Sequence, residues 1–168
     1  DVTAEVPMHF LLLDESEFAN QGPRVKTTPP LRTRADCEAL WGALADGTLD
    51  ALACDHFLGT LAVQPRDPKF TRDAAAGIGG LELSMPLLFS AGVKEKRVSL
   101  QRFVEVVAER PAQIGGVWPR KGRIAVGADA DLTFIDSNTN WRIAAQGDFS
   151  RADTTPFAGM ILQGKVKR

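Results

Sequence analysis

The stretch Leu49–His56 constrains the fold more than any other, because a nearly continuous apolar run ends in an ionisable pair. Four of its first six residues are Leu or Ala. Such a run, placed after a helix-like segment, is typical of a strand buried on both faces of a parallel sheet. Asp55 and His56 would then lie at the carboxyl end of the strand, where parallel α/β folds gather their chemistry. A carboxylate there can bind a metal or take a proton, and a structural Asp-His pair closing a loop fits the spacing equally well.

The segment before this strand predicts an amphipathic helix. Thr33 is placed as its N-cap, and Asp36 at the third helical position is a weaker form of the capping-box acid. Gly47 is placed to end the helix two residues before the strand. The apolar stripe has the spacing i, i+3, i+4, i+7 and consists of Cys37, Leu40, Trp41 and Leu44. Helix, tight turn and buried strand together form the αβ half of a repeating α/β unit.

Shorter elements are predicted on both sides of this unit. Residues 1–6 alternate like a strand, so His9 would lie just past a strand end, either facing an active site or packed in the core. Ser99 is the expected N-cap of a helix over residues 100–109, and Pro111 is expected to fix the end of that helix.

The region after the Asp-His pair predicts a long loop and a glycine turn. Residues 59–76 contain prolines and several charges, and long loops after the carboxyl end of a strand are often functional lids. Gly77–Gly80 contains three glycines and precedes a short helical segment at 81–85. Closely set glycines before a helix let backbone N–H groups approach a ligand, but they also serve ordinary tight turns.

The pattern changes near residue 118. Residues 121–136 predict a strand, a turn and a second strand, and residues 160–166 predict a final strand. We therefore expect an α/β domain over residues 1–117 and a β domain over residues 118–168.

Composition narrows the classes of function. The 168 residues are 44% apolar, and the 20 basic and 21 acidic side chains nearly cancel, which gives no electrostatic reason to expect nucleic acid or an anionic membrane as a partner. No membrane-spanning run, signal peptide or CxxC motif is present, so a cytoplasmic protein with free thiols is expected. The chain has two histidines, fewer than a self-contained catalytic metal site usually uses.

Four stretches resemble cyclic amidohydrolases of the dihydroorotase, hydantoinase and allantoinase group. Residues 3–13 resemble the family stretch TAEVTPHHLLL, and residues 29–33 resemble the NPPLRT loop. Residues 46–56 are similar to DGTIDAIATDH, the last barrel strand of that family. Residues 119–131 closely match PRKGxIAVGADAD, where the chain leaves the barrel. The last two motifs are specific in combination, and the order and spacing of all four agree with the family.

The resemblance implies an α/β fold, the C-terminal part of a (β/α)8 barrel followed by strands of a small β-sandwich. It implies hydrolysis of a small cyclic amide by a zinc-activated hydroxide, as in pyrimidine metabolism, usually between two Zn²⁺ ions. Asp55 would be a metal ligand and the proton shuttle, while Ala76 and Gly77 match the loop whose backbone holds the substrate ring. The other family ligands, a His-x-His, a lysine and two further histidines, match positions before Asp1. Residues 1–168 alone are therefore expected to bind no binuclear zinc.

Two positions depart from dihydroorotases and so affect the expected substrate. Thr28 stands where those enzymes commonly have a substrate-contacting Asn, and Gly59 stands where their DHAPH motif has its second His. Both positions are still expected to border the substrate, but unmade polar contacts argue against dihydroorotate itself. Hydantoinase-like members vary more freely at these two positions. The alternative is a catalytically inactive homologue with a structural or partner-binding role; a homo-oligomer is expected in either case.

Overall fold

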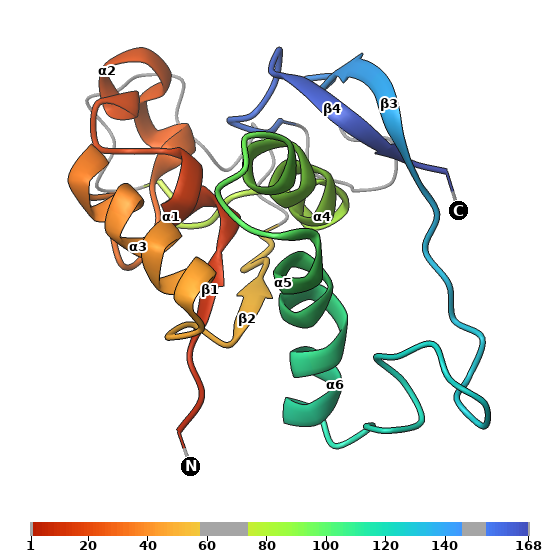
Figure 1. Cartoon of the computed structure of the whole chain (residues 1–168). Helices are drawn as coiled ribbons and strands as arrows, with labels where there is room; N and C mark the ends of the chain where they lie inside the picture. The colour runs from red at the N-terminus through yellow and green to blue at the C-terminus, as the bar shows by residue number, and fades with distance from the viewer. Residues whose placement is uncertain (1, 58–73, 146–153, 168) are drawn as a thin grey trace.

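The two strands predicted around the first helical segment are parallel neighbours. In this computed structural model, which describes residues 2–57, 74–145 and 154–167, β1 (Glu5–Pro7) pairs with β2 (Ala51–Ala53). The chain between them forms α1 (Met8–Leu12), α2 (Glu17–Gln21), η1 (Gly22–Val25) and α3 (Arg34–Asp46), and α3 lies beside the strand pair (Figure 1). Parallel strands need such a crossover, because a tight turn cannot return the chain to the same end. The predicted helix-turn-strand unit is confirmed.

The predicted ends of α3 are also confirmed. The Thr33 hydroxyl accepts from the backbone N–H of Asp36 at 3.3 Å, and the Asp36 carboxylate accepts from the N–H of Thr33 at 3.0 Å. These bonds form a capping box that satisfies helix N–H groups left without intrahelical partners. Gly47 ends the helix with φ of 94°, in the left-handed region where glycine meets little steric penalty.

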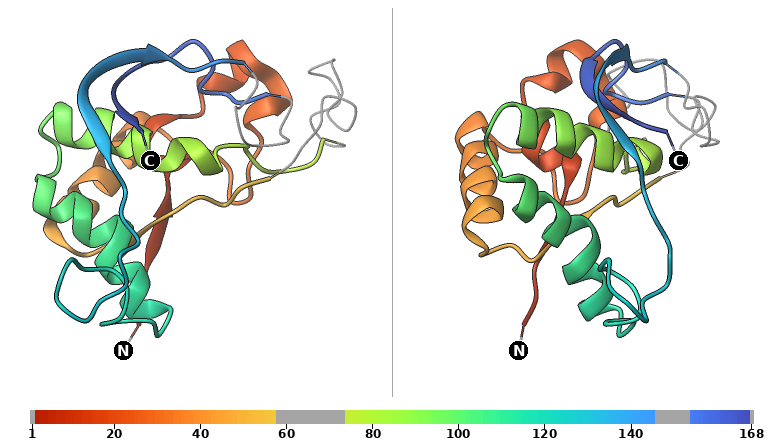
Figure 2. Two further views of the ribbon diagram at one scale, coloured as in Figure 1. Left: turned by 90° about the vertical axis from the view of Figure 1, so that its right-hand side faces the viewer. Right: turned by 45° about the vertical axis from the view of Figure 1, so that its right-hand side comes forward.

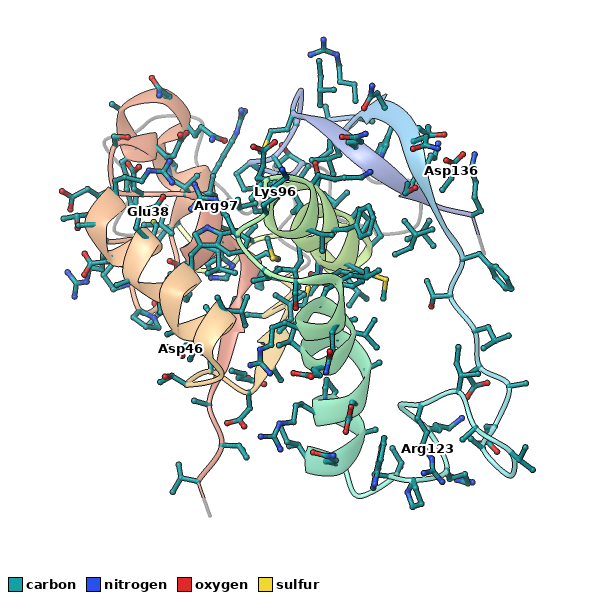
Figure 3. All side chains as sticks on the ribbon, in the orientation of Figure 1. Glu38, Asp46, Lys96, Arg97, Arg123 and Asp136 are labelled. Atoms are coloured by element: carbon teal, nitrogen blue, oxygen red, sulfur yellow. The ribbon has the colours of Figure 1, made fainter. Side chains whose placement is uncertain are left out.

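Two side chains of α3 bind it to neighbouring segments of the chain. The indole N–H of Trp41 donates to the carbonyl of Leu11 at 2.9 Å. Arg97, from the turn that follows η4 (Phe89–Lys94), reaches Glu38 with an N–O distance of 2.5 Å (Figure 3). Its guanidinium carbon also lies 5.4 Å from the centre of the Trp41 ring, within the range of a cation–π contact. The helix is thus tied to α1 and to the segment after η4.

Both strands of the parallel pair are shorter than the sequence predicts. The first begins at Glu5 rather than at the chain start, and Val2 is 97% exposed. Within β2 only Ala51 is fully buried, so the prediction of a strand buried on both faces is wrong for its other residues. The strands are short because each has a single pairing partner: among the described residues, β1 and β2 are each other's only strand neighbours. A strand extends only as far as its partner continues.

The second long helix continues past the proline that was expected to end it. It comprises α5 (Leu100–Val104), the π-helical segment η5 (Glu105–Glu109) and α6 (Arg110–Ile114). Pro111 lies in the first turn of α6, directly after the π-helical segment, where i→i+5 bonding changes the hydrogen-bond register. A proline inside a helix removes one backbone hydrogen bond, and a π-helical change of register is an arrangement that accommodates such a loss. The prediction of an end before Pro111 was therefore wrong.

Arg102 anchors this helix to the turn between α3 and β2. Its guanidinium donates to the carbonyl of Leu44 at 2.8 Å and to the carbonyl of Leu49. The same side chain pairs with Glu105 at 3.1 Å. The Leu44 carbonyl lies in the last turn of α3, where carbonyl groups lack intrahelical donors. Leu49 lies just before β2, so Arg102 holds the helix end and the start of the strand together.

A second, antiparallel sheet lies over the middle helices. The chain passes through η3 (Leu81–Leu83), α4 (Ser84–Leu88) and η4, and later forms β3 (Ile135–Arg142) and β4 (Ile161–Val166). The backbone N–H of Gln163 in β4 donates to the hydroxyl of Ser90 in η4 at 3.0 Å. Figure 2 shows β3 and β4 curving over the α4–η4 region. The final predicted strand is confirmed to within one residue.

The predicted strand-turn-strand over residues 121–136 is wrong, since β3 begins only at Ile135. The described backbone before it has a turn in which the N–H of Asp129 donates to the carbonyl of Arg120 at 2.8 Å. Ile124 is 90% exposed, and this arm stands apart from α5 and α6 along much of its length (Figure 1). Its sequence suits a strand, but among the described residues no strand lies beside it to accept its hydrogen bonds.

One hydrophobic cluster joins most of the described elements. It contains Val6 and Leu11 from the first α/β unit and Leu88 from α4, together with Phe157 and Leu162 near and within β4. The division into domains at residue 118 stays a prediction. Among the described helices, none combines the length and the apolar character that crossing a membrane requires.

Candidate active site

Asp55 lies just beyond the carboxyl end of β2. It is exposed, and its φ of 49° lies in the left-handed region that non-glycine residues rarely adopt. Strained residues of this kind concentrate at functional sites, where the surrounding structure holds them in place. The predicted location at the end of a parallel strand is confirmed, while the direction of the carboxylate into a barrel stays a prediction.

His9 lies at the end of the neighbouring strand, in α1. Its side chain is 2% exposed, and among the described residues its Nε2 has no hydrogen-bond partner. Burial lowers the pKa of His9 to about 4, although the negative charge of Asp55 acts in the opposite direction. Of the two alternatives raised by the sequence, packing in the core is confirmed, while a role of His9 at an active site stays a prediction.

The glycine segment runs directly alongside the residues that follow Asp55. His56 and Ile78 form a parallel bridge, and the N–H of Phe57 donates to the carbonyl of Ile78 at 3.1 Å. His56 Nδ1 accepts from the N–H of Gly80 at 3.1 Å and from that of Leu81 at 3.2 Å. The predicted glycine turn before a helix is confirmed, and its backbone is held against the end of β2.

A third segment, Lys26–Thr28, is fastened to the other end of the glycine segment. The N–H of Gly77 donates to the carbonyl of Lys26 at 2.8 Å, and the Lys26 ammonium donates to the carbonyl of Ala74 at 2.6 Å. Thr28 is exposed and precedes a cis-proline, while Ala76 is half-buried. These bonds bring the segments of Thr28, Ala76 and Gly77 together, as the predicted substrate residues require.

Two features of this region complete the comparison with the sequence. Gly59, predicted to border the substrate, lies outside the described residues. The two N–H groups bonded by His56 were missed, although a histidine beside a candidate catalytic aspartate and ahead of a glycine-rich turn was a signal available in the sequence. The predicted roles of the site residues stay predictions.

The positions of the possible metal ligands test whether the described residues could form the expected zinc site. Among residues 2–57, 74–145 and 154–167, no three His, Cys, Asp or Glu side chains form a group able to hold a metal ion. Asp55 nevertheless offers an exposed carboxylate, and an oxygen ligand of this type suits zinc. The described residues therefore fit one ligand position and require the others from elsewhere.

In parallel α/β folds, functional residues gather at the carboxyl ends of the strands, and Asp55 has such a position. Comparison with known proteins gives the family. The model of the amidohydrolase family matches residues 11–168, and the chain belongs to that family.

The chain is similar to hydantoinases in both sequence and structure. It is 36% identical to a D-phenylhydantoinase of Escherichia coli O1:K1 / APEC, over 99% of this chain and 37% of that protein. An L-hydantoinase (dihydropyrimidinase) from Arthrobacter aurescens superimposes with a TM-score of 0.94 at 34% identity, covering 99% of this chain and 37% of the other. For a dihydropyrimidinase from Brevibacillus agri NCHU1002 the TM-score is 0.90 at 31% identity, covering 98% and 37%. The chain thus spans about 37% of the length of these relatives.

Proposed function

We propose that the protein carrying this chain hydrolyses a cyclic amide of the hydantoin or dihydropyrimidine type. The observation that carries the proposal is the position of Asp55, at a parallel strand end beside the Gly77–Gly80 backbone. The hydantoinase relatives support this substrate class. The departures at Thr28 and Gly59 also favour it over dihydroorotate.

We further propose that this chain forms the C-terminal part of a (β/α)8 barrel followed by strands of a small β-sandwich. The parallel pair β1–β2 with its helical crossover is the repeating unit of such a barrel. In a barrel, strand ends lie at one face, so Asp55 would meet ligands from other strands there. A homo-oligomeric enzyme is part of the same proposal.

Asp55 would bind one of two Zn²⁺ ions and move the proton. A metal ion held there would lower the pKa of its bound water and polarise the carbonyl of the amide. The Asp55 carboxylate accepts the proton of the attacking water and returns it to the ring nitrogen as the C–N bond breaks. Meanwhile the backbone groups of Ala76 and Gly77 bind the ring, and Thr28 borders it.

The experiment uses the full-length protein, loaded with zinc, with hydantoin, dihydrouracil and dihydroorotate as substrates. Asp55→Asn should keep the fold and lower kcat by roughly a thousandfold, because the amide has nearly the shape of the carboxylate but accepts no proton. Asp46→Asn is the matched control (Figure 3), since it removes the same charge from an exposed site at the end of α3. Its activity should stay within about twofold of wild type.

The outcomes separate the two hypotheses drawn from the sequence. Hydantoin or dihydrouracil hydrolysis that Asp55→Asn abolishes supports the enzyme. Near-normal turnover by Asp55→Asn would remove the proton shuttle from this residue. A wild-type protein that binds no zinc and hydrolyses none of the three substrates would be the inactive homologue.

A further inference from the structure

The His56 ring joins the end of β2 to the far end of the glycine segment. Two backbone N–H groups, of Gly80 and Leu81, converge on one ring nitrogen, Nδ1, at 3.1 and 3.2 Å. A backbone N–H can only donate, so Nδ1 must present its lone pair to both. The neutral ring therefore carries its proton on Nε2, and this tautomer is set by the loop that the ring holds.

These two bonds act at the end of the loop that leads into η3. At the other end of the segment, the N–H of Gly77 is held by the carbonyl of Lys26. Near Gly80, the Ser84 hydroxyl donates to the Gly80 carbonyl at 3.0 Å. Among the described residues, the His56 side chain is what bonds the Gly80–Leu81 N–H groups to the segment that bears Asp55. The middle of the loop is held to the same segment by the N–H of Phe57, which donates to the carbonyl of Ile78 at 3.1 Å. Since His56 directly follows Asp55, the position of the Gly80–Leu81 end of the loop relative to the carboxylate depends on this ring.

We propose that His56 is a positioning residue that sets the distance between the ring-binding backbone and Asp55. This inference rests on the proposed function, in which the Ala76–Gly77 backbone binds the cyclic amide. Loss of the two bonds would free the Gly80–Leu81 end of the loop and leave the Phe57–Ile78 backbone bond to hold the loop near β2, while the carboxylate stays in place. Substrate binding should therefore suffer more than the chemical step, so KM should rise more than kcat falls.

The test compares two substitutions of His56 by side chains with an amide group. Their carbonyl oxygens, which accept hydrogen bonds, lie at different distances from the backbone. In His56→Asn, Oδ1 is bonded to Cγ as Nδ1 is, so it can accept from both N–H groups. In His56→Gln, the acceptor lies one bond further out, at the level of Nε2. The expected result in the full-length enzyme is a KM for dihydrouracil raised about tenfold in His56→Gln and less than threefold in His56→Asn. In both variants kcat should stay within about threefold.

A second measurement is independent of activity. Hydrogen exchange of the Gly80 and Leu81 amides should remain slow in wild type and in His56→Asn, and become faster in His56→Gln. Equal exchange in the two variants, or equal KM values, would overturn the positioning role. If the wild-type protein hydrolysed no cyclic amide, the proposed function would fail, but the exchange comparison would still decide whether His56 holds the loop.

Discussion

Alanine substitutions at three glycines can separate two costs of adding a side chain, the steric clash with neighbours and the strain of a positive φ. Gly77, in the proposed ring-binding loop, has φ of 135°, and a Cβ added there would lie 2.3 Å from Cβ of Phe57. Gly47 at the end of α3 has φ of 94° with nothing within 4 Å of such a Cβ. Gly42, within α3, also has open space and no positive φ. Alanine at the three sites therefore tests clash plus strain, strain alone, and neither.

The expected changes in the free energy of unfolding follow from these environments. Gly42→Ala should stabilise by about 0.5–1 kcal/mol, because alanine is the better helix former and restricts the unfolded chain. Gly47→Ala should destabilise by about 1 kcal/mol through the left-handed φ. Gly77→Ala adds a strained φ of about 1–3 kcal/mol to overpacking of about 1–3 kcal/mol, a total of roughly 2–6 kcal/mol.

Urea unfolding followed by circular dichroism measures all three variants. The clash involves Cβ of Phe57, an atom next to the backbone that no side-chain rotation can move away. Adding Phe57→Gly to Gly77→Ala should therefore make the alanine substitution less costly than it is in the wild-type background. The reasoning is refuted if Gly77→Ala destabilises no more than Gly47→Ala, or if the double variant shows no coupling.

Two further outcomes concern buried titratable groups. The pKa of His9 is about 4 in the folded chain and 6.5 unfolded, so the unfolded state binds more protons between these values and stability falls as pH decreases. The loss should be about 2 kcal/mol between about pH 7 and about pH 5, and urea unfolding of His9→Gln should show a smaller loss over the same range. Burial raises the pKa of the half-buried Cys54 thiol despite its hydrogen bond with Ser84, so Cys54 should react slowly with thiol reagents at neutral pH. Labelling of Cys54 in the folded protein as fast as in urea would contradict this.

Local signals in the sequence predicted the features that depend on neighbouring residues. Thr33, Asp36 and Gly47 were sufficient to place both ends of α3, because capping bonds join residues only three or four positions apart. The apolar run before Asp55 likewise predicted a strand with a carboxylate after it, although most of that strand is only partly buried. Motifs of the same local kind were also enough to suggest the amidohydrolase family.

Features that depend on distant partners were decided only by the tertiary structure. The sequence of residues 121–134 suits strands, yet the described backbone forms none, since a strand exists only where another backbone accepts its bonds. The helix containing Pro111 continues because a π-helical segment precedes the proline, a hydrogen-bond pattern that apolar periodicity does not reveal. The site follows the same rule: His56 and Gly80 are 24 positions apart, and only folding brings the Nδ1 atom to the two N–H groups that it holds.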